Sequence, residues 1–203
     1  MPYRRTTAVQ ARLDAGRDTL FSSAIDVLSA HGYKGLSIAS VAAAAGVSTG
    51  SVYTHFASKS DLVVAIFREV CSREVDAVAE AGSTGTVVER VTAIVETFAG
   101  RALSNRTMAY ALLAEPVDRA VDAERLVFRK SFTDAIARAV VAGIAAGDIP
   151  EQNADLAAAG LVGAVGEVLV GPLGPDSTSA TQSDVVPDLV AFALRSLGVR
   201  RDR

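Results

Sequence analysis

The stretch from Val41 to Val63, VAAAAGVSTGSVYTHFASKSDLV, decides how this chain is interpreted. Four consecutive alanines, Ala42 to Ala45, precede Gly46, and Ser48 follows two residues later. Small residues let two helices approach closely, the glycine accepts the positive φ of a tight turn, and the serine caps the next helix. This order is typical of a helix-turn-helix, whose second helix enters the major groove of DNA.

The second helix of this pair is expected over residues 49–55, with Val47, Val52 and Phe56 facing the core. Its outer face would carry Thr49, Ser51, Tyr53, Thr54 and His55. An alanine-rich helical hairpin with an ordinary glycine cap would have the same spacing, so the motif alone leaves both interpretations open. Lys59 is the only Lys or Arg in the stretch, so phosphate contacts would depend on hydroxyls, backbone N–H groups and helix N-termini as well.

The rest of the chain is predicted to be helical too. Apolar residues recur at spacings of three and four, Gly- and Pro-containing breaks separate the segments, and no strand-like alternation persists for more than a few residues. We expect about nine helices, over residues 14–31, 37–45, 49–55, 58–80, 86–103, 105–114, 119–146, 153–170 and 184–197. The predicted fold class is all-α, with a three-helix head and N-terminal arm over 1–57 and a helical body over 58–203.

Composition narrows the classes of function. Of 203 residues, half are hydrophobic, and there is one Cys and no Trp. A single Cys excludes an internal disulfide, and one Cys with two His is too few for a zinc cluster, so no metal or other cofactor is expected. No triad order, metal-ligand spacing or P-loop is present, and His31 and His55 both fall in the head, so we do not expect an enzyme.

The single cysteine favours a reducing cytoplasm, and the charge distribution gives the chain one basic end. The formal net charge is −3, but residues 1–60 hold six basic and three acidic side chains, while the remainder holds 14 basic and 20 acidic. The N-terminus lacks the apolar segment of a secretory signal. The apolar stretch 156–174 is interrupted by Glu167, Gly and Pro, so we expect no membrane-spanning helix.

Residues from about Arg17 to Phe67 resemble the TetR family, the tetracycline-repressor-like transcriptional regulators. The elements that match are His31-Gly32-Tyr33, Leu36-Ser37-Ile38, Val41-Ala42, Ala45-Gly46-Val47-Ser48, Gly50-Ser51-Val52-Tyr53, Phe56, Ser58-Lys59 and Leu62. The resemblance implies a three-helix DNA-binding head, an all-helical ligand-binding body, and a homodimer formed by the last two helices.

The resemblance also implies roles for particular residues of the head. The major-groove set would be Ser48, Thr49, Gly50, Ser51 and Tyr53, with Ser37, His55 and Lys59 at phosphates. Thr54 shares the exposed face, and Arg4 and Arg5 would extend an arm toward the minor groove. Many family members carry a charged or amide side chain where this chain has Ala39 or Thr49. Base reading would therefore depend on hydroxyls, Tyr53, thymine methyl groups and DNA shape.

We expect most of the larger apolar side chains of the body to line a ligand cavity. They are Phe67, Cys71, Ile94, Phe98, Met108, Tyr110, Leu112, Phe128 and Phe132. Ordinary core packing is the alternative for each of them. Glu167 interrupts an apolar helix, so its carboxylate would meet the ligand, reach solvent or find a partner across the dimer.

Two further features of the body carry open alternatives. Arg125 and Arg129 lie one helical turn apart, so they share a face that could grip a carboxylate, or they could be solvated and paired with Asp122 or Glu124. We expect small and apolar residues on the last two helices to lie at the dimer interface that the resemblance implies. These are Gly160, Gly163, Ala164, Leu189, Phe192 and Ala193.

The sequence thus favours a ligand-responsive bacterial transcriptional regulator, most simply a homodimeric repressor. A small hydrophobic effector would release it from a palindromic double-stranded DNA operator. A helical scaffold or ligand carrier without DNA binding is the alternative, and the polar residues Tyr53, His55 and Lys59 argue against it. The identity of the effector, the operator sequence and the choice between repression and activation stay open.

Overall fold

The computed structural model describes residues 7–177 and 185–199, and these ranges consist of nine α-helices and their connections without a strand. The helices are α1 (Thr7–Gly35), α2 (Ile38–Ala44), α3 (Thr49–His55), α4 (Lys59–Ala81), α5 (Val87–Ser104), α6 (Arg106–Leu113), α7 (Arg119–Ala145), α8 (Ala154–Leu173) and α9 (Val185–Ser196). The predicted all-α class and the order of nine helices are confirmed.

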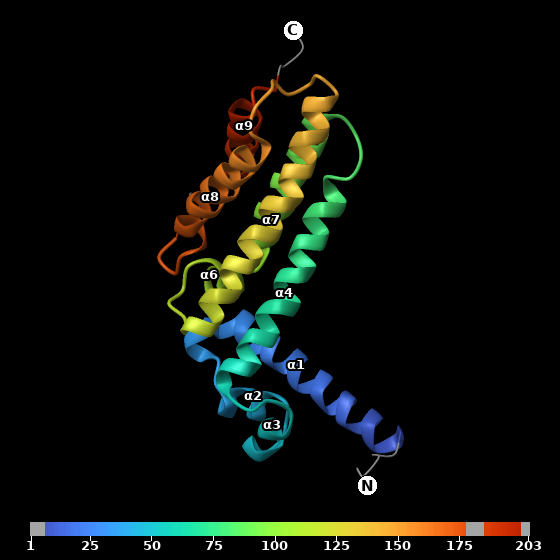
Figure 1. The fold of residues 1–203 in the computed structure, drawn as a ribbon. Coiled ribbons are helices and arrows are strands. Elements are labelled where there is room, and N and C mark those ends of the chain that lie inside the picture. Colours follow the sequence, from blue (N-terminus) through green and yellow to red (C-terminus); the bar gives the residue numbers. More distant parts are fainter. Residues whose placement is uncertain (1–6, 178–184, 200–203) are drawn as a thin grey trace.

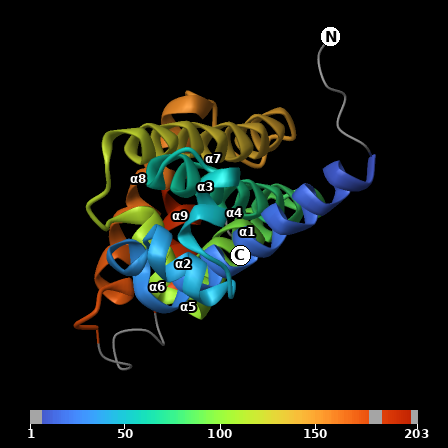
Figure 2. The same cartoon turned by 90° about the horizontal axis from the view of Figure 1, so that it is seen from below.

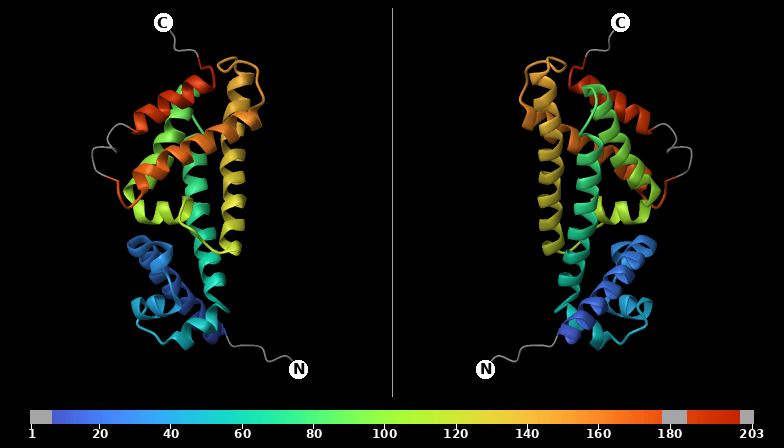
Figure 3. Two further views of the ribbon diagram at one scale, coloured as in Figure 1. Left: turned by 90° about the vertical axis from the view of Figure 1, so that its left-hand side faces the viewer. Right: turned by 90° about the vertical axis from the view of Figure 1, so that its right-hand side faces the viewer.

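The molecule has two lobes joined along α4. The helices α1, α2 and α3 form one end, which we call the head, and α4 runs out of the head into the body (Figures 1 and 3). There α4 packs on α7, α7 packs on α8, and α5 packs on α9. Seen from below, the N-terminal half of α1 projects outside the outline of the body (Figure 2).

Serine caps and one glycine set the boundaries of the short head helices. The side chains of Ser37, Ser48 and Ser58 accept hydrogen bonds from the backbone N–H groups of the residues three positions later, at the starts of α2, α3 and α4. Gly46, after the end of α2, has φ 67°, a conformation that other residues adopt at a cost. These caps and the positive φ of Gly46 confirm the predictions from the sequence.

Two boundaries differ from those predicted. The first helix begins at Thr7 rather than near Asp14, and it continues to Gly35 beyond a break at Gly32, whose φ is 65° and ψ −169°. The predicted stop at His31 is therefore a change of direction. The eighth helix runs to Leu173, past Pro172. Proline itself accepts helical φ, and Gly171 before it has no Cβ to clash with the ring.

Two large apolar clusters divide the core. One joins the head to the first half of α4 and includes Leu28, Val52 and Phe67. The other holds the body together and includes Leu169 and Leu197. The prediction that Val47 faces the core is wrong, since its side chain is 40% exposed. Its backbone N–H closes the turn by donating to Ala42 O at 3.0 Å, which leaves the side chain outside.

One face of α8 has no covering within the described chain. Leu161, Val165 and Leu169 are buried, while Leu156 is exposed on the other side of the helix. By length and composition alone α8 would suit a membrane-crossing helix, and a third of its most apolar window is buried in the protein. In this structure its buried face packs along α7.

Replacing Phe67 by alanine is expected to lower the free energy of unfolding by about 3–5 kcal/mol, because the ring is fully buried where head and α4 meet. Urea denaturation of both proteins would measure the change. Leu126→Ala is the control, since that side chain is 64% exposed and its loss should change stability by less than about 0.5 kcal/mol. Equal effects for the two variants would contradict the assignment of Phe67 to the core.

Candidate DNA-binding surface and body cavity

The outer face of α3 is a continuous polar surface. Ser48, Thr49, Gly50 and Ser51 are exposed, and the side chain of Tyr53 is 56% exposed. The hydroxyls of Ser48 and Ser51 lie 3.0 Å apart, and Thr54 Oγ1 donates to Gly50 O at 3.1 Å. Val52 and Phe56 are buried beneath this face, as predicted, so packing fixes which side of α3 is presented.

The electrostatic surroundings of α3 favour an anionic partner. The sequence has no acidic residue from Val27 to Ser60, and neither α2 nor α3 has an acidic side chain in its first turn. The partial positive charge at the start of each helix is therefore not neutralised by a carboxylate on that helix. Lys34 and Lys59 lie in the same segment, so the field over this surface favours phosphate.

The residues expected at phosphates are each held by a neighbour. Ser37 Oγ caps α2 in a reciprocal pair with Ser40, and Lys59 Nζ lies 4.6 Å from the centre of the Tyr33 ring. His55 is half-buried beside α1, where a Cβ added at Gly16 would lie 3.4 Å from its Nε2 atom. Arg17 stacks over Phe56 at 5.6 Å. Arg4 and Arg5 lie outside the described residues.

A buried carboxylate joins the head to the body. Glu115, in the loop between α6 and α7, is 7% exposed. Its Oε2 accepts from the backbone N–H of Tyr33 at 2.8 Å, and its Oε1 accepts from that of Lys34 at 3.0 Å. The sequence analysis did not single out this function for Glu115, because the partners lie more than 80 residues away and are backbone atoms.

A second contact reinforces this junction. Asp118 accepts from the Tyr33 hydroxyl at 2.9 Å and caps α7 through the N–H groups of Ala120 and Val121. Burial raises the pKa of Tyr33, and the hydrogen bond to Asp118 adds to that rise. Burial acts to raise the pKa of Asp118 as well, but its hydrogen bonds, led by that from Val121, hold the pKa below the ordinary value.

A cavity of about 700 Å³ lies in the body, with walls from α4, α5, α6, α7 and α8. Most of the side chains predicted to line a cavity do so. They are Cys71, Ile94, Phe98, Met108, Leu112, Phe128, Phe132 and Glu167. Phe98 of α5 and Phe132 of α7 meet edge to face with ring centres 5.2 Å apart, so these two walls touch there. The volume lies in the range of small-molecule sites.

Two residues expected in the lining lie elsewhere. Phe67 is on the part of α4 that packs against the head, and its ring is fully buried there. Tyr110 packs against the body cluster of α5, α8 and α9. Helical spacing groups residues by face, but it does not tell which of two cores a face meets.

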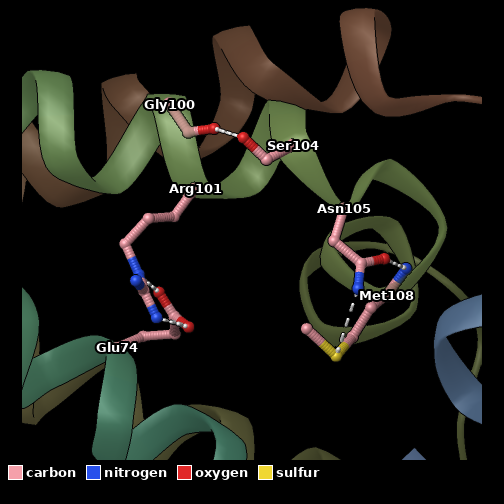
Figure 4. Close-up of polar contacts among 6 residues, drawn as sticks. All are labelled: Glu74, Gly100, Arg101, Ser104, Asn105 and Met108. Carbon is pink, nitrogen blue, oxygen red and sulfur yellow. Dashed lines mark hydrogen bonds and ion pairs between the residues drawn. The ribbon is translucent and has the colours of Figure 1, made fainter. Parts of the chain in front are cut away.

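Polar contacts at the cavity wall come from residues far apart in sequence. Arg101 of α5 binds Glu74 of α4 through two hydrogen bonds, Nε to Oε2 at 2.5 Å and Nη2 to Oε1 at 2.8 Å. Figure 4 shows this pair beside Asn105, which accepts from the Met108 N–H at 3.3 Å. The pairing of Glu74 with Arg101 is not predicted from the sequence. The two residues are 27 positions apart, and no local pattern indicates that their helices lie side by side.

Cys71 lies in the same cavity wall, and its thiol is expected to be unreactive. Burial, with a smaller contribution from Glu74, raises the pKa of its thiol to about 12. Cysteine binds metals and attacks electrophiles as the thiolate, so this side chain acts as a small apolar group near neutral pH. Within the described residues, no cluster of three or more His, Cys, Asp or Glu side chains is placed to bind a metal.

The residues expected at a dimer interface divide into two groups. Gly160, Gly163 and Phe192 are exposed, and Ala164 is half-buried. Leu189 and Ala193 are buried within the protomer, in the cluster where α9 packs on α5. They are therefore not available to a second copy, and the inner face of α9 contributes to the core of its own chain.

Comparison with known proteins identifies the head. The family described as bacterial regulatory proteins, tetR family, matches residues 20–66. Over these residues the head matches the TetR family. The chain is also 44% identical over 66 residues to the HTH-type transcriptional regulator CymR of Pseudomonas putida. That match spans 32% of each protein, so it covers about a third of the curated relative.

Solved structures share the whole TetR-family fold. The fatty acid degradation regulator FadR from Bacillus halodurans is 21% identical, covering 90% of this chain and 99% of that one, with a TM-score of 0.72. A TetR transcription regulator from Haloarcula marismortui is 18% identical, covering 91% of this chain and 97% of that one, with a TM-score of 0.77. FadR from Bacillus subtilis, in complex with stearoyl-CoA, is 19% identical, covering 89% of this chain and 95% of that one, with a TM-score of 0.67. At these identities the likeness concerns the fold.

The raised pKa of Cys71 predicts slow labelling by an aromatic disulfide reagent. At pH 8 a pKa of about 12 leaves on the order of a thousandfold less thiolate than the ordinary cysteine value of about 8.5. We expect the rate to rise by at least that factor in denaturing urea, followed by absorbance of the released thiol. A folded protein that reacts at the rate of a free thiol would contradict the buried placement of Cys71.

Proposed function

We propose that this chain is a ligand-responsive transcriptional repressor that acts in the bacterial cytoplasm as a homodimer. Residues 1–57 would bind DNA, and residues 58–203 would bind an effector and form the dimer. The observation that supports DNA binding most strongly is the outer face of α3, where Ser48, Thr49, Ser51 and Tyr53 are exposed within a segment free of acidic residues. The family and fold are those of DNA-binding regulators rather than of enzymes.

The proposed docking places α3 in the major groove. The hydroxyls of Thr49 and Ser51 and the ring of Tyr53 would meet base edges, with Ser48, Gly50 and Thr54 beside them. Ser37, His55, Lys59 and the Arg4-Arg5 arm would contact phosphates or the adjacent minor groove. Two heads in successive major grooves would require half-sites about 34–36 Å apart.

The uncovered face of α8 supports the dimer. A Cβ at Gly160, Gly163 or Gly166 would have no heavy atom within 4 Å outside its own helix. Leu156 extends this face, and Phe192 of α9 is also exposed. An apolar helix face with small residues is suited to close packing against a second copy, and twofold symmetry would bring the same face of the partner onto it.

The cavity supports a small hydrophobic effector. It lies beside α4, which continues into the head, and beside the loop whose Glu115 binds the head backbone. A ligand favouring one arrangement of these elements would change the spacing of two heads. The shift is limited by the difference of its affinities for the two arrangements, typically about 1–3 kcal/mol.

Removal of the Tyr53 ring is expected to weaken operator binding at least tenfold, because this exposed side chain makes no core contact and projects from the proposed groove face. The operator would first be selected from fragmented genomic DNA and footprinted, and affinity then measured by fluorescence anisotropy at two salt concentrations. Val88→Ala is a control, because Val88 is also exposed but lies on α5.

A protected inverted repeat, with weaker binding at high salt and for Tyr53→Ala only, would support the repressor. Failure to enrich any fragment, from protein shown by mass spectrometry to be free of ligand, would favour a helical carrier without DNA binding.

Gly163→Leu is expected to convert the dimer to monomer while the protomer stays folded. Space around Gly163 is open in the protomer, where it also borders the cavity, and leucine is the better helix former. The protomer should therefore fold, while a closely packed second copy would be disturbed. Light scattering coupled to gel filtration measures the mass, and circular dichroism the helicity. Gly100→Leu is the matched control, because Gly100 is also a helical glycine in open space, but on α5. An unchanged dimer mass for Gly163→Leu would contradict the α8 interface.

A further inference from the structure

The polar groups of the cavity are gathered at one end. The cavity follows α7 from Arg125 to Val140, roughly 22 Å along the helix axis. Near the head its walls carry Glu74, Arg101, Asn105, Arg125 and Arg129, whereas Val78, Val91, Ile136, Ala139 and Val140 form the distant end. Figure 1 shows that α4 and α7 both begin beside the head and run away from it, so residues earlier in these two helices lie nearer the head. The space is therefore amphipathic along its length.

The charges at the polar end do not cancel. Arg101 and Glu74 neutralise each other in a bidentate pair. This leaves Arg125 and Arg129 against Glu167, so the charged groups in the lining are three basic and two acidic. Within the described chain, Glu167 forms no ion pair with either arginine.

The acidic neighbours on α7 are engaged elsewhere or turned outward. Glu124 binds Arg68 at 2.6 Å, and Asp134 binds Lys130 at 2.9 Å. Asp122 is exposed and forms no ion pair among the residues described. The alternative from the sequence, in which Asp122 or Glu124 pairs with the two arginines, is therefore not what the structure adopts.

Arg125 is held in place by carbonyl groups and forms no ion pair within the described residues. Its Nε donates to Leu112 O at 2.9 Å, and its Nη2 donates to Ala111 O at 2.7 Å and Glu115 O at 2.6 Å. Its other terminal nitrogen, Nη1, makes no hydrogen bond within the described residues. Burial lowers the pKa of Arg125 and repulsion from Arg129 contributes, while Asp122 and Glu115 oppose the shift.

From this arrangement we infer that the effector is an amphipathic anion, an apolar chain or ring system ending in one carboxylate, with the carboxylate at Arg125 and Arg129. The apolar part lies along Phe128, Phe132 and Ile136 toward the far end of the cavity. Guanidinium groups match the geometry of carboxylates and bind them with charge-assisted hydrogen bonds. A single negative charge also balances the lining.

The same geometry connects the effector to the head. The carbonyl of Glu115 accepts from Arg125, and the carboxylate of Glu115 accepts from Tyr33 and Lys34 beside Gly32. An anion that draws the Arg125 guanidinium toward the cavity competes with those carbonyls and so displaces the loop that holds the head. This regulatory consequence rests on the proposed function, whereas binding of the anion does not.

Isothermal titration calorimetry of the full chain with sodium decanoate and with 1-decanol tests the inference without DNA. The two probes have the same apolar chain, and only decanoate has a charge at neutral pH. We expect decanoate to bind at least tenfold more tightly, and Arg129→Gln to remove about fivefold to tenfold of that preference without changing the affinity for 1-decanol. Arg129 is exposed, so this variant should fold normally.

Two further variants provide the controls. Arg138→Gln removes the same charge from the same helix but outside this cavity, and it should leave decanoate binding unchanged. Glu167→Gln should tighten decanoate binding, because it removes the acidic charge that faces the site from α8. Equal affinities for the two probes, no binding of either, or equal losses for Arg129→Gln and Arg138→Gln would overturn the inference.

The operator assay separates failure of this inference from failure of the proposed function. Decanoate bound as expected but without effect on operator affinity would leave the anion site in place and remove its regulatory role. An operator complex released by decanoate in the parent protein but not in Arg129→Gln would support both.

Discussion

The orientation of the head on the body depends on one buried carboxylate. A carboxylate removed from water is costly unless hydrogen bonds replace its hydration, and Glu115 is satisfied by the backbone N–H groups of Tyr33 and Lys34. Those two groups are free because α1 breaks at Gly32, where φ is 65°. A Cβ at Gly32 would also lie 2.8 Å from Glu115 Oε2. The glycine therefore provides both the turn and the space for the carboxylate.

The remaining contacts of the junction are arranged around this one. Asp118 binds the Tyr33 hydroxyl from the same loop, and Arg125 holds the loop from α7 through the carbonyl of Glu115. The loop between α6 and α7 is thus hydrogen-bonded to the head on one side and to a cavity residue on the other. The packed apolar clusters of the head and the body resist deformation. A displacement of the loop between α6 and α7 would therefore rotate the head as a unit and would not loosen the packing locally.

Local sequence determined the elements well, and it determined much less about which element faces which. The caps at Ser37, Ser48 and Ser58 and the turn at Gly46 depend on residues within four positions, so their chemistry is visible in the sequence. Phe67, Leu189 and Ala193 were correctly placed on apolar faces but assigned to the wrong neighbours. An apolar face is equally suited to a cavity, a core or a second subunit, and only the packing distinguishes them.

By itself the sequence determined the all-helical fold, the helix-turn-helix and the polar face of α3, because each follows from periodicity, capping and turn residues that act over a few positions. The tertiary structure alone decided the pairing of Glu74 with Arg101, the hydrogen bonds of Glu115 to Tyr33 and Lys34, and the lack of an ion pair to Arg125 or Arg129 among the described residues. The first two contacts join residues that are 27 and more than 80 positions apart. The two arginines lack an ion pair to Glu124 because Glu124 binds Arg68 instead. Such choices depend on how whole helices pack, which no short window of sequence contains.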